Sequence, residues 1–278
     1  MSPLVLPFPG IDPVAFSLGP FDVRWYGLAF AVGLILGWLY MRTLVADRPL
    51  WQPSGPALSL DQVDAFVVWL ITGVVVGGRL GQALLYDPAY YASHPAEIVQ
   101  PWKGGMSFHG ALVGAIIAIL LYARRTAVAA RTLMDLACAG IPIGVLLGRI
   151  ANFINSEHWG HASDVPWAMV FPNGGDTPRH PSQLYEALLE GLALFALLRI
   201  VTHRRLGLAR PGLVAGVWLL GYGGARIVCE VFREPETGHA LNIGPVTAGQ
   251  LFSAPMIAFG IYLVRTAARP ATVIGKTA

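Results

Sequence analysis

Charged residues are scarce in this chain of 278 residues: Asp, Glu, Lys and Arg make up 13% of it, whereas 55% is hydrophobic. Soluble domains carry about 25% charged residues, so the composition excludes a soluble enzyme. The mean hydropathy is +0.57, and a helix needs about 20 apolar residues to cross a membrane. We therefore expect residues 1–278 to form a single integral membrane domain.

Cysteine is also rare, and several signatures of catalysis are missing. Cys138 and Cys229 both lie inside apolar runs, so no disulfide framework is implied. The sequence has no Walker loop, no His and Cys cluster at metal-ligand spacing, and no paired-aspartate motif. The net charge of +3 is small and spread over many loops, which speaks against nucleic acid as a partner. No metal and no cofactor are expected.

Seven apolar stretches are present, each long enough to cross a membrane. They cover about residues 25–44, 63–86, 107–123, 132–150, 181–201, 212–232 and 246–265. Pro181, Pro211 and Pro245 stand at or just before a helix start, where a missing N–H costs nothing. We predict an all-α polytopic fold of seven transmembrane helices.

The basic residues alternate between the two ends of these helices. Twelve lie at one end, namely Arg42, Arg48, Arg124, Arg125, Arg131, Arg199, Arg204, Arg205, Arg210, Arg265, Arg269 and Lys276. Six lie at the other, namely Arg24, Lys103, Arg149, Arg179, Arg226 and Arg233. The positive-inside rule places the richer set in the cytoplasm. The N-terminus is then periplasmic and the C-terminus cytoplasmic, which requires an odd number of spans.

Two periplasmic segments carry further expectations. Residues 1–21 contain no Lys or Arg, so they lack the basic start of a secretory signal, and the first span is expected to remain as an anchor. Residues 151–180 mix turn residues with aromatic ones, which is typical of an ordered segment. We expect residues 151–180 to form a small periplasmic cap between the fourth and fifth spans.

Polar groups gather at the periplasmic end of the predicted helices, where they are costly near hydrocarbon and suggest a site. The first set follows the fourth span and comprises Arg149, Asn152, Glu157 and Gly160; the second shares one face of the sixth helix and comprises Tyr222, Arg226, Glu230 and Arg233. An arginine offers a planar fork of donors that matches phosphate oxygens. We hypothesise that Arg149 holds a lipid phosphate.

Three other positions have both a functional and a structural interpretation. Tyr26 is either part of the site or an interfacial anchor at the start of the first span. Arg79, set between glycines in the second span, either binds substrate or forms a salt bridge to a carboxylate such as Glu186 or Glu230. His109 follows a glycine-rich turn, and it is either a proton acceptor or a hydrogen-bonded packing histidine.

The motifs around these residues resemble those of the bacterial prolipoprotein diacylglyceryl transferase family. They are residues 24–27, 105–110, 148–160, 180–186 and 222–235, in the family's order over nearly the whole chain. Ala151 is a small departure, because the family often has glycine there. The resemblance implies transfer of the diacylglyceryl group of phosphatidylglycerol to the lipobox cysteine thiol of a prolipoprotein. The products are a thioether and glycerol phosphate.

The resemblance also implies a place and a set of site residues. The place is the bacterial cytoplasmic (inner) membrane, with the lipid bilayer, phosphatidylglycerol and the lipobox segment as partners. The family's catalytic and lipid-binding positions correspond to Tyr26, His109, Arg149, Asn152, Glu157, Gly160, Tyr222, Arg226 and Glu230. We add Arg79 and Arg233 as substrate-binding candidates.

The reaction requires a base for the thiol and positive charge for the leaving phosphate. We predict that His109 is the base, with Tyr222 as an alternative base or proton relay, and that Arg149 and Arg226 stabilise the phosphate. A lipid or anion transporter using the same arginines is an alternative. A second alternative is an intramembrane serine protease using Ser107 and His109, although residues two apart on a helix point in different directions.

Overall fold

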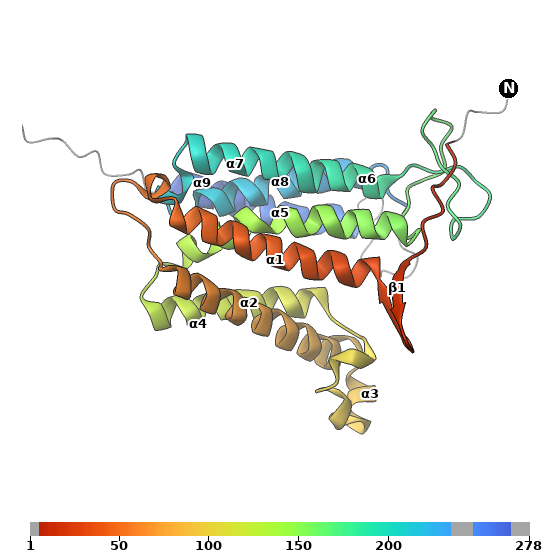
Figure 1. The fold of residues 1–278 in the computed structure, drawn as a ribbon, viewed down its shortest axis with the longest axis horizontal. Helices are drawn as coiled ribbons and strands as arrows, with labels where there is room; N and C mark the ends of the chain where they lie inside the picture. The colour runs from red at the N-terminus through yellow and green to blue at the C-terminus, as the bar shows by residue number, and fades with distance from the viewer. Residues whose placement is uncertain (1–5, 235–246, 268–278) are drawn as a thin grey trace, which may run out of the picture.

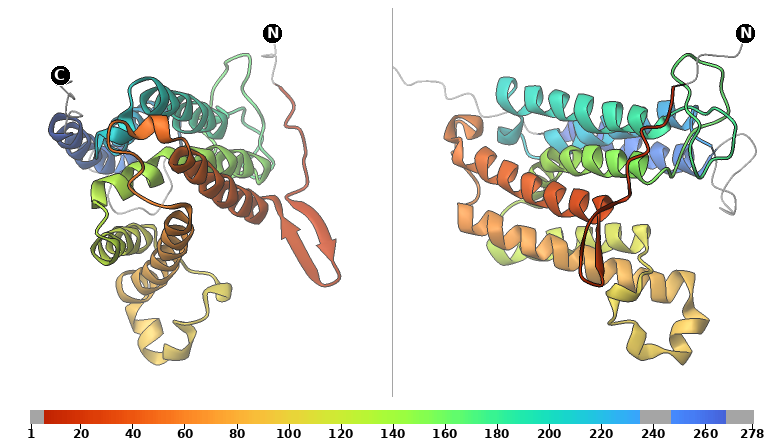
Figure 2. Two further views of the ribbon diagram at one scale, coloured as in Figure 1. Left: turned by 60° about the vertical axis from the view of Figure 1, so that its left-hand side comes forward. Right: turned by 45° about the vertical axis from the view of Figure 1, so that its right-hand side comes forward.

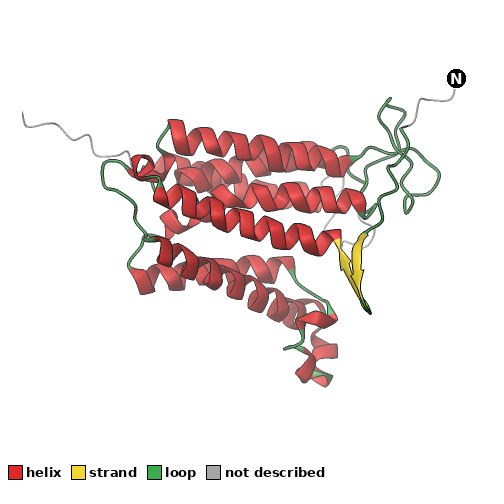
Figure 3. Ribbon diagram, viewed as in Figure 1, coloured by secondary structure: helices red, strands yellow, loops and turns green. Residues whose placement is uncertain are grey.

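Long helices dominate the computed structural model, which describes residues 6–234 and 247–267 (Figures 1 and 3). They are α1 (Trp25–Ala46), α2 (Leu60–Gly81), α4 (Phe108–Thr126), α5 (Ala130–Ile154), α8 (Leu213–Glu230) and α9 (Ala248–Thr266). In addition, α6 (Ser182–Glu186), the π-helix η5 (Ala187–Ala193) and α7 (Leu194–Arg204) follow one another without a break. All seven predicted stretches are thus helical, with ends shifted by a few residues.

The prediction of seven spans is supported in a coarser form. Within the described ranges, five helices are long and apolar enough to cross a membrane: α1, α2 with its continuation η2 (Gln82–Tyr86), α4, α5 and α8. The predicted start at residue 246 lies outside the described residues. The observed fold is therefore that of a mostly helical, multi-pass membrane protein.

The prediction of an all-α chain is wrong before the first long helix. Residues there form an antiparallel hairpin of β1 (Val14–Leu18) and β2 (Phe21–Arg24), in which Leu18 pairs with Phe21. Gly19 supplies a positive φ of 61° at the turn. Alternating β-branched and aromatic residues around a glycine turn predict a hairpin, but a search for long apolar runs passes over so short a pattern.

Short helices fill the connections. They are η1 (Arg48–Trp51), α3 (Pro88–Ser93), η3 (Pro95–Glu97), η4 (Pro101–Lys103) and η6 (Gly207–Ala209). Together with η2, the helices α3, η3 and η4 build a projection between α2 and α4, which we call the arm (residues 82–106; Figures 1 and 2).

Two groups of helices meet at one end of the molecule. We call the end that carries residues 151–180 the cap end, and the opposite end, where Arg124, Arg131 and Arg204 lie, the basic end. The α2–α4 pair joins the main bundle of α1, α5, α6–α8 and α9 at the basic end and diverges from it toward the arm (Figures 1 and 2).

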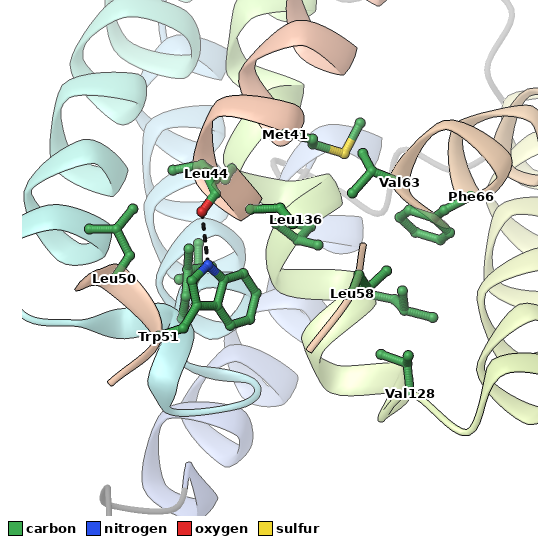
Figure 4. Packing of buried hydrophobic residues seen from close by; sticks show 14 of the residues in the cluster. Met41, Leu44, Leu50, Trp51, Leu58, Val63, Phe66, Val128 and Leu136 are labelled. Atoms are coloured by element: carbon green, nitrogen blue, oxygen red, sulfur yellow. Dashed lines mark hydrogen bonds between the residues drawn. The ribbon is translucent and has the colours of Figure 1, made fainter. Parts of the chain in front are cut away.

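The junction at the basic end is a closely packed apolar core. Met41, Leu44, Phe66 and Leu136, from three helices, are all less than 9% exposed. Trp51 packs among them and donates a hydrogen bond from Nε1 to the Leu44 carbonyl oxygen at 2.8 Å (Figure 4). This core fixes the angle at which the α2–α4 pair leaves the bundle.

A single carboxylate sets the position of α8 against α5. Asp135 of α5 is fully buried and accepts hydrogen bonds from the backbone N–H groups of Gly212 and Ala215, both at 2.7 Å. The first N–H groups of a helix have no partner within it, so Asp135 satisfies the start of α8 from another helix. The register of α8 along α5 is thereby fixed, and with it the position of Arg226 relative to Arg149.

Glycines bring two helix pairs into backbone contact, as small residues do in membrane helices. A Cβ added to Gly114 of α4 would lie 2.0 Å from the carbonyl oxygen of Gly73 in α2. In the bundle, a Cβ on Gly33 of α1 would lie 2.9 Å from the Cα of Gly144 in α5. Only glycine fits at Gly114 and Gly33.

We predict that Gly114→Ala destabilises the protein although alanine is the better helix former. Overpacking costs about 1–3 kcal/mol, because α4 must move away from α2. The measurement is the thermal unfolding midpoint in detergent. Gly144→Ala is the matched control, since a Cβ there meets nothing within 4 Å. Equal midpoints for the two variants would contradict the packing at Gly114.

Candidate functional site

The charged side chains at the cap end form one cluster of three arginines and three glutamates. Glu186 of α6 lies at its centre and is fully buried. Its oxygens are approached by guanidinium nitrogens of Arg226 at 2.7 Å, Arg149 at 3.1 Å and Arg233 at 3.1 Å. The three arginine side chains are only 10–18% exposed. The structure thus brings together residues that the sequence places on three separate helices.

Two further glutamates complete the cluster. Glu190 is fully buried; its Oε2 lies 3.1 Å from Nη2 of Arg149 and its Oε1 lies 3.7 Å from Nη1 of Arg226. Glu230, one turn after Arg226 on α8, approaches that arginine at 2.7 Å. Arg149 and Arg226 therefore share two carboxylates, and the six side chains are formally neutral together.

The π-helix η5 explains why Glu190 reaches Arg149. Gly191 of η5 lies so close to α5 that a Cβ there would be 2.8 Å from the Cα of Leu146. Leu146 is one helical turn before Arg149 on α5. Glu190, the residue next to Gly191, therefore faces the guanidinium of Arg149. Single π-helical turns are often found at functional sites.

Sequence reasoning missed Glu190 and treated Glu186 only as a salt-bridge partner for Arg79. The signal was present: two glutamates four residues apart interrupt an otherwise apolar helix. Charges inside a membrane helix mark a candidate site. The two negative charges of these glutamates balance the two positive charges of Arg149 and Arg226.

An irregular turn follows α5 and shapes the outer side of the cluster. Ser156 and His158 have positive φ angles of 54° and 59°, a conformation that is uncommon outside glycine. The turn is held by Asn152, which donates to Oε1 of Glu157 at 2.8 Å, and by Gln183, which donates to the Glu157 carbonyl oxygen at 2.6 Å. Asn152, one turn after Arg149 on α5, thus pairs with Glu157.

Gly160 joins this turn to the end of α8. It pairs with Arg233 in an antiparallel bridge, and a Cβ there would lie 2.2 Å from the Phe232 carbonyl oxygen. Arg233 in turn contacts Glu186 and, at 3.1 Å, Nδ1 of His158. Gly160 is therefore required for backbone contact, and it places Arg233 in the cluster.

Two tyrosines border the cluster. Tyr222 stacks on Trp218 with ring centroids 5.3 Å apart, and it lies within electrostatic range of Glu190 and Arg149. Tyr26, at the start of α1, is 39% exposed and lies within electrostatic range of Glu157 and Arg149. Both hydroxyl-bearing residues predicted for the site thus lie near the charges.

His109 lies beside the cluster and not in it. Its Nδ1 is 3.0 Å from the hydroxyl of Tyr86, and its ring is 5.0 Å from that of Phe252 in α9. One turn earlier on α9, a Cβ on Gly249 would lie 2.5 Å from Glu230. His109 and Glu230 therefore both lie against the first turns of α9.

Ser107 has a structural task in the observed fold. It is 2% exposed, and its hydroxyl oxygen accepts the backbone N–H of Gly110 at 3.0 Å, which caps α4. His109 has Tyr86 as its hydrogen-bond partner. This geometry gives no support to a Ser107–His109 catalytic pair.

Arg79 lies in a different environment from the other arginines. It is 5% exposed and donates to the backbone carbonyl oxygens of Glu97, Ile98, Gly104 and Gly105. Its guanidinium also lies 5.1 Å from the ring centre of Tyr91. Of the two alternatives for Arg79, the salt bridge to Glu186 or Glu230 is wrong, since those carboxylates face other arginines. Arg79 holds the arm together.

Residues 155–180, which follow α5, contain no helix or strand and are held by side-chain packing. Phe171 is fully buried, with ring centroids 5.4 Å from Phe8 and 6.0 Å from Phe153. Burial lowers the pKa of His180, helped by nearby His161, so its imidazole is neutral at pH 7. Its Nδ1 lies 3.0 Å from the Tyr185 hydroxyl. The segment covers the end of the bundle where the charged cluster lies.

The cluster has the means to bind an anion. Arg149 and Arg226 each carry five N–H donors, more than their ion pairs with the glutamates use, and part of each side chain reaches the surface. In the described part of the chain, no group of His, Cys, Asp or Glu side chains is placed to hold a metal ion. What the site offers a ligand is guanidinium groups held in fixed orientations.

Comparison with known proteins gives a consistent result. The family model described as prolipoprotein diacylglyceryl transferase matches residues 13–266. A phosphatidylglycerol–prolipoprotein diacylglyceryl transferase of Sinorhizobium medicae is 50% identical over 264 residues, which are 95% of this chain and 94% of the relative. The protein of that name from Methylocella silvestris is 51% identical over 268 residues, which are 96% and 97% of the two chains.

We predict that Arg79→Lys loosens the arm. A lysine has one ammonium group in place of the planar fork, so several of the four carbonyl oxygens lose their donor, at about 1–3 kcal/mol for each buried group left unpaired. Limited proteolysis within residues 88–106 is the measurement, and cleavage should be faster. Arg125→Lys, at an exposed arginine of the basic end, is the control. An unchanged cleavage rate in Arg79→Lys would argue against this assignment.

Proposed function

The chain belongs to the prolipoprotein diacylglyceryl transferase family, and from that premise we propose its reaction in detail. It is a transferase that moves the diacylglyceryl group of phosphatidylglycerol to a prolipoprotein. We propose that the acceptor is the lipobox cysteine thiol, and that the products are a thioether and glycerol phosphate. The observation that carries this proposal is the pair Arg149 and Arg226, fixed around the same two carboxylates.

The chemistry is a displacement at a primary carbon. The thiolate sulfur attacks the carbon of the diacylglyceryl group that bears the phosphate. The carbon–sulfur bond forms, and the bond between that carbon and the phosphate oxygen breaks. The electron pair of that bond leaves with glycerol phosphate, and the thiol proton goes to a base. Negative charge grows on the phosphate oxygens during the step. Arg149 and Arg226 stabilise it, because preorganised donors act most strongly where charge develops.

The buried glutamates keep these guanidiniums in place for the step. An unpaired arginine at this depth is costly, and a flexible one must be ordered when the substrate binds. Glu186, Glu190 and Glu230 remove both costs, since they hold the guanidiniums at 2.7–3.7 Å before the lipid arrives. Arg233 extends the positive surface toward the cap.

The base is His109 in this proposal, with Tyr222 as the alternative. A thiol has a free pKa of about 8.5 and reacts as the thiolate, and an imidazole is suited to accept its proton near neutral pH. The hydrogen bond between His109 and Tyr86 orients the ring. Tyr222 lies within electrostatic range of Arg149 and Arg226, which supports it as an alternative base or proton relay.

The remaining site residues shape the pocket around the reacting groups. Asn152 and Glu157 hold the turn after α5, and Gly160 lets that turn meet the end of α8. We assign Tyr26 to the lipid interface, where it borders Glu157 and Arg149. Arg79 acts at a distance in this proposal, by ordering the arm that carries Tyr86.

The topology follows the distribution of basic residues. We propose seven spans in the bacterial inner membrane, with a periplasmic N-terminus, a cytoplasmic C-terminus and residues 151–180 as a periplasmic cap. In this orientation the charged cluster lies at the level of the outer leaflet, where phosphatidylglycerol headgroups and the lipobox of an exported prolipoprotein both arrive. The acyl chains stay in the bilayer during the reaction.

The transporter alternative finds little support in the packing. A path for lipid or anion requires polar groups through to the opposite end of the bundle. The basic end is instead filled by the apolar core around Leu44, Trp51 and Leu136. A charged cluster at one end of the bundle and an apolar core at the other fit a transferase better than a transporter.

We predict that the purified protein converts a lipobox peptide into its diacylglyceryl thioether when phosphatidylglycerol is the lipid. The measurement is the mass of the peptide together with the release of labelled glycerol phosphate. A peptide whose cysteine is replaced by serine is the control and should stay unmodified. Peptide cleavage would favour the protease, and no change to either substrate would remove the proposed reaction.

We predict that Arg149→Lys lowers kcat by about 100- to 1,000-fold, the usual effect of losing one preorganised donor. Lysine keeps the positive charge between Glu186 and Glu190, so the fold survives, whereas alanine would leave two buried carboxylates short of a partner. The measurement is initial transfer rate with a thermal midpoint for each variant. Activity within about threefold of the parent chain would exclude the phosphate role.

We predict that His109→Gln lowers kcat/KM near pH 7 by about 100-fold or more, as expected for loss of a general base. Glutamine still reaches Tyr86 but takes up no proton. Raising the pH should restore part of the rate, because the thiol ionises by itself above about pH 8.5. A pH–rate profile is the measurement, and His94→Gln, on the exposed arm, is the control. An unaltered profile would transfer the role to Tyr222.

A further inference from the structure

Three carboxylate oxygens of the charged cluster accept no hydrogen bond from the described residues, and one of them is also beyond hydrogen-bond distance of its ion-pair nitrogen. Oε1 of Glu190 is buried and accepts no hydrogen bond from the described residues, and its ion-pair partner, Nη1 of Arg226, is 3.7 Å away. That distance is too long for a hydrogen bond. The oxygens Oε2 of Glu186 and Oε2 of Glu230 also lack a hydrogen bond, but guanidinium nitrogens lie within 3.1 and 2.7 Å of them. Buried acceptors are nearly always satisfied, so the exception at Glu190 calls for a donor.

This oxygen lies where the headgroup of the lipid would be. Glu190 touches both Arg149 and Arg226, the two residues to which the proposed function assigns the phosphate. In phosphatidylglycerol, the phosphate carries a terminal glycerol with two hydroxyl groups, only a few bonds from phosphorus. A phosphate held by these arginines therefore brings hydroxyl donors next to the Glu190 carboxylate.

We propose that Glu190 determines specificity for the lipid headgroup, by accepting a hydrogen bond from a hydroxyl of its terminal glycerol. This inference rests on the proposed function. A hydroxyl suits the position because it donates a hydrogen bond without adding a third cation beside two guanidiniums. A site built to bind a hydroxyl discriminates strongly against an analogue that lacks it, because the buried acceptor is then left unpaired.

The fold presents this oxygen through two unusual features. The π-helix η5 carries Glu190, and the close approach of Gly191 to Leu146 presses η5 against α5. One carboxylate oxygen is thereby committed to Arg149 at 3.1 Å, while the other is left without a hydrogen bond. A headgroup hydroxyl would donate the hydrogen bond that Oε1 of Glu190 lacks in the protein alone.

The test compares two lipids that differ only in the headgroup hydroxyls. Phosphatidylglycerol and phosphatidylpropanol carry the same acyl chains and the same phosphate charge, but phosphatidylpropanol has no hydroxyl donor. The readout is the ratio of their kcat/KM values with one lipobox peptide. A hydrogen bond to a charged acceptor predicts a ratio of roughly 10 to 100 in the full-length protein. A ratio near 1 would overturn the inference.

Variants assign the preference to Glu190. In Glu190→Gln the acceptor is neutral, and in Glu190→Ala it is absent, so the ratio should fall about three- to tenfold in the first and approach 1 in the second. Glu230→Gln is the matched control. It removes the same charge from the surroundings of Arg226, so it should lower both kcat/KM values together and leave their ratio unchanged.

Different outcomes would contradict the role of Glu190 and the proposed transfer reaction. If the parent chain transfers neither lipid, the proposed function fails. If it prefers phosphatidylglycerol but Glu190→Gln keeps the full ratio, the reaction stands and the role of Glu190 is overturned. Because the readout is a ratio within one variant, a partial loss of stability or activity does not alter its meaning, and Glu190→Gln remains informative if Glu190→Ala does not fold.

Discussion

The structure depends on one carboxylate, that of Glu186, which is fully buried and faces three guanidiniums. A buried charge without partners costs several kcal/mol, so α5, α6 and α8 must assemble together or leave charges exposed to hydrocarbon. The same contacts that satisfy Glu186 orient Arg149, Arg226 and Arg233 toward one place. Stability and the proposed anion binding therefore depend on a single set of ion pairs, so we expect substitutions of these arginines to affect both.

Other parts of the fold serve to hold this assembly or to bring a second group to it. Asp135 fixes the register of α8 against α5 from the basic end, and Gly160 joins the cap to the end of α8. His109 belongs instead to the α2–α4 pair, which is anchored in the apolar core at the basic end and diverges from the bundle toward the arm (Figures 1 and 4). The proposed phosphate site and the proposed base thus stand on two different groups of helices, and both lie against the first turns of α9.

Much of the architecture could be predicted because hydropathy and charge act locally. Long apolar runs located the helices to within a few residues, and polar groups at one end indicated a site that contains Arg149 and Arg226. Arg79 shows the limit of that reasoning: it shares their chemistry and their side of the molecule, but its partners are four backbone carbonyl oxygens of the arm. A pairing between an arginine and a carbonyl oxygen leaves no trace in the side-chain pattern. Glu190 was missed although it and Glu186 interrupt an apolar helix, because the sequence does not show which arginines the two carboxylates face.

The sequence by itself determined that this chain crosses a membrane repeatedly, where its helices lie and, through its motifs, the family to which it belongs. These properties follow from the free energy of placing each short segment in hydrocarbon or in water, which does not depend on the rest of the fold. Only the tertiary structure decided which charges meet, because ion pairs between helices require side chains far apart in sequence to approach within about 4 Å. That approach is set by glycine contacts, the π-helix η5 and the carboxylate of Asp135. The local sequence around each of these features does not show which helix it contacts.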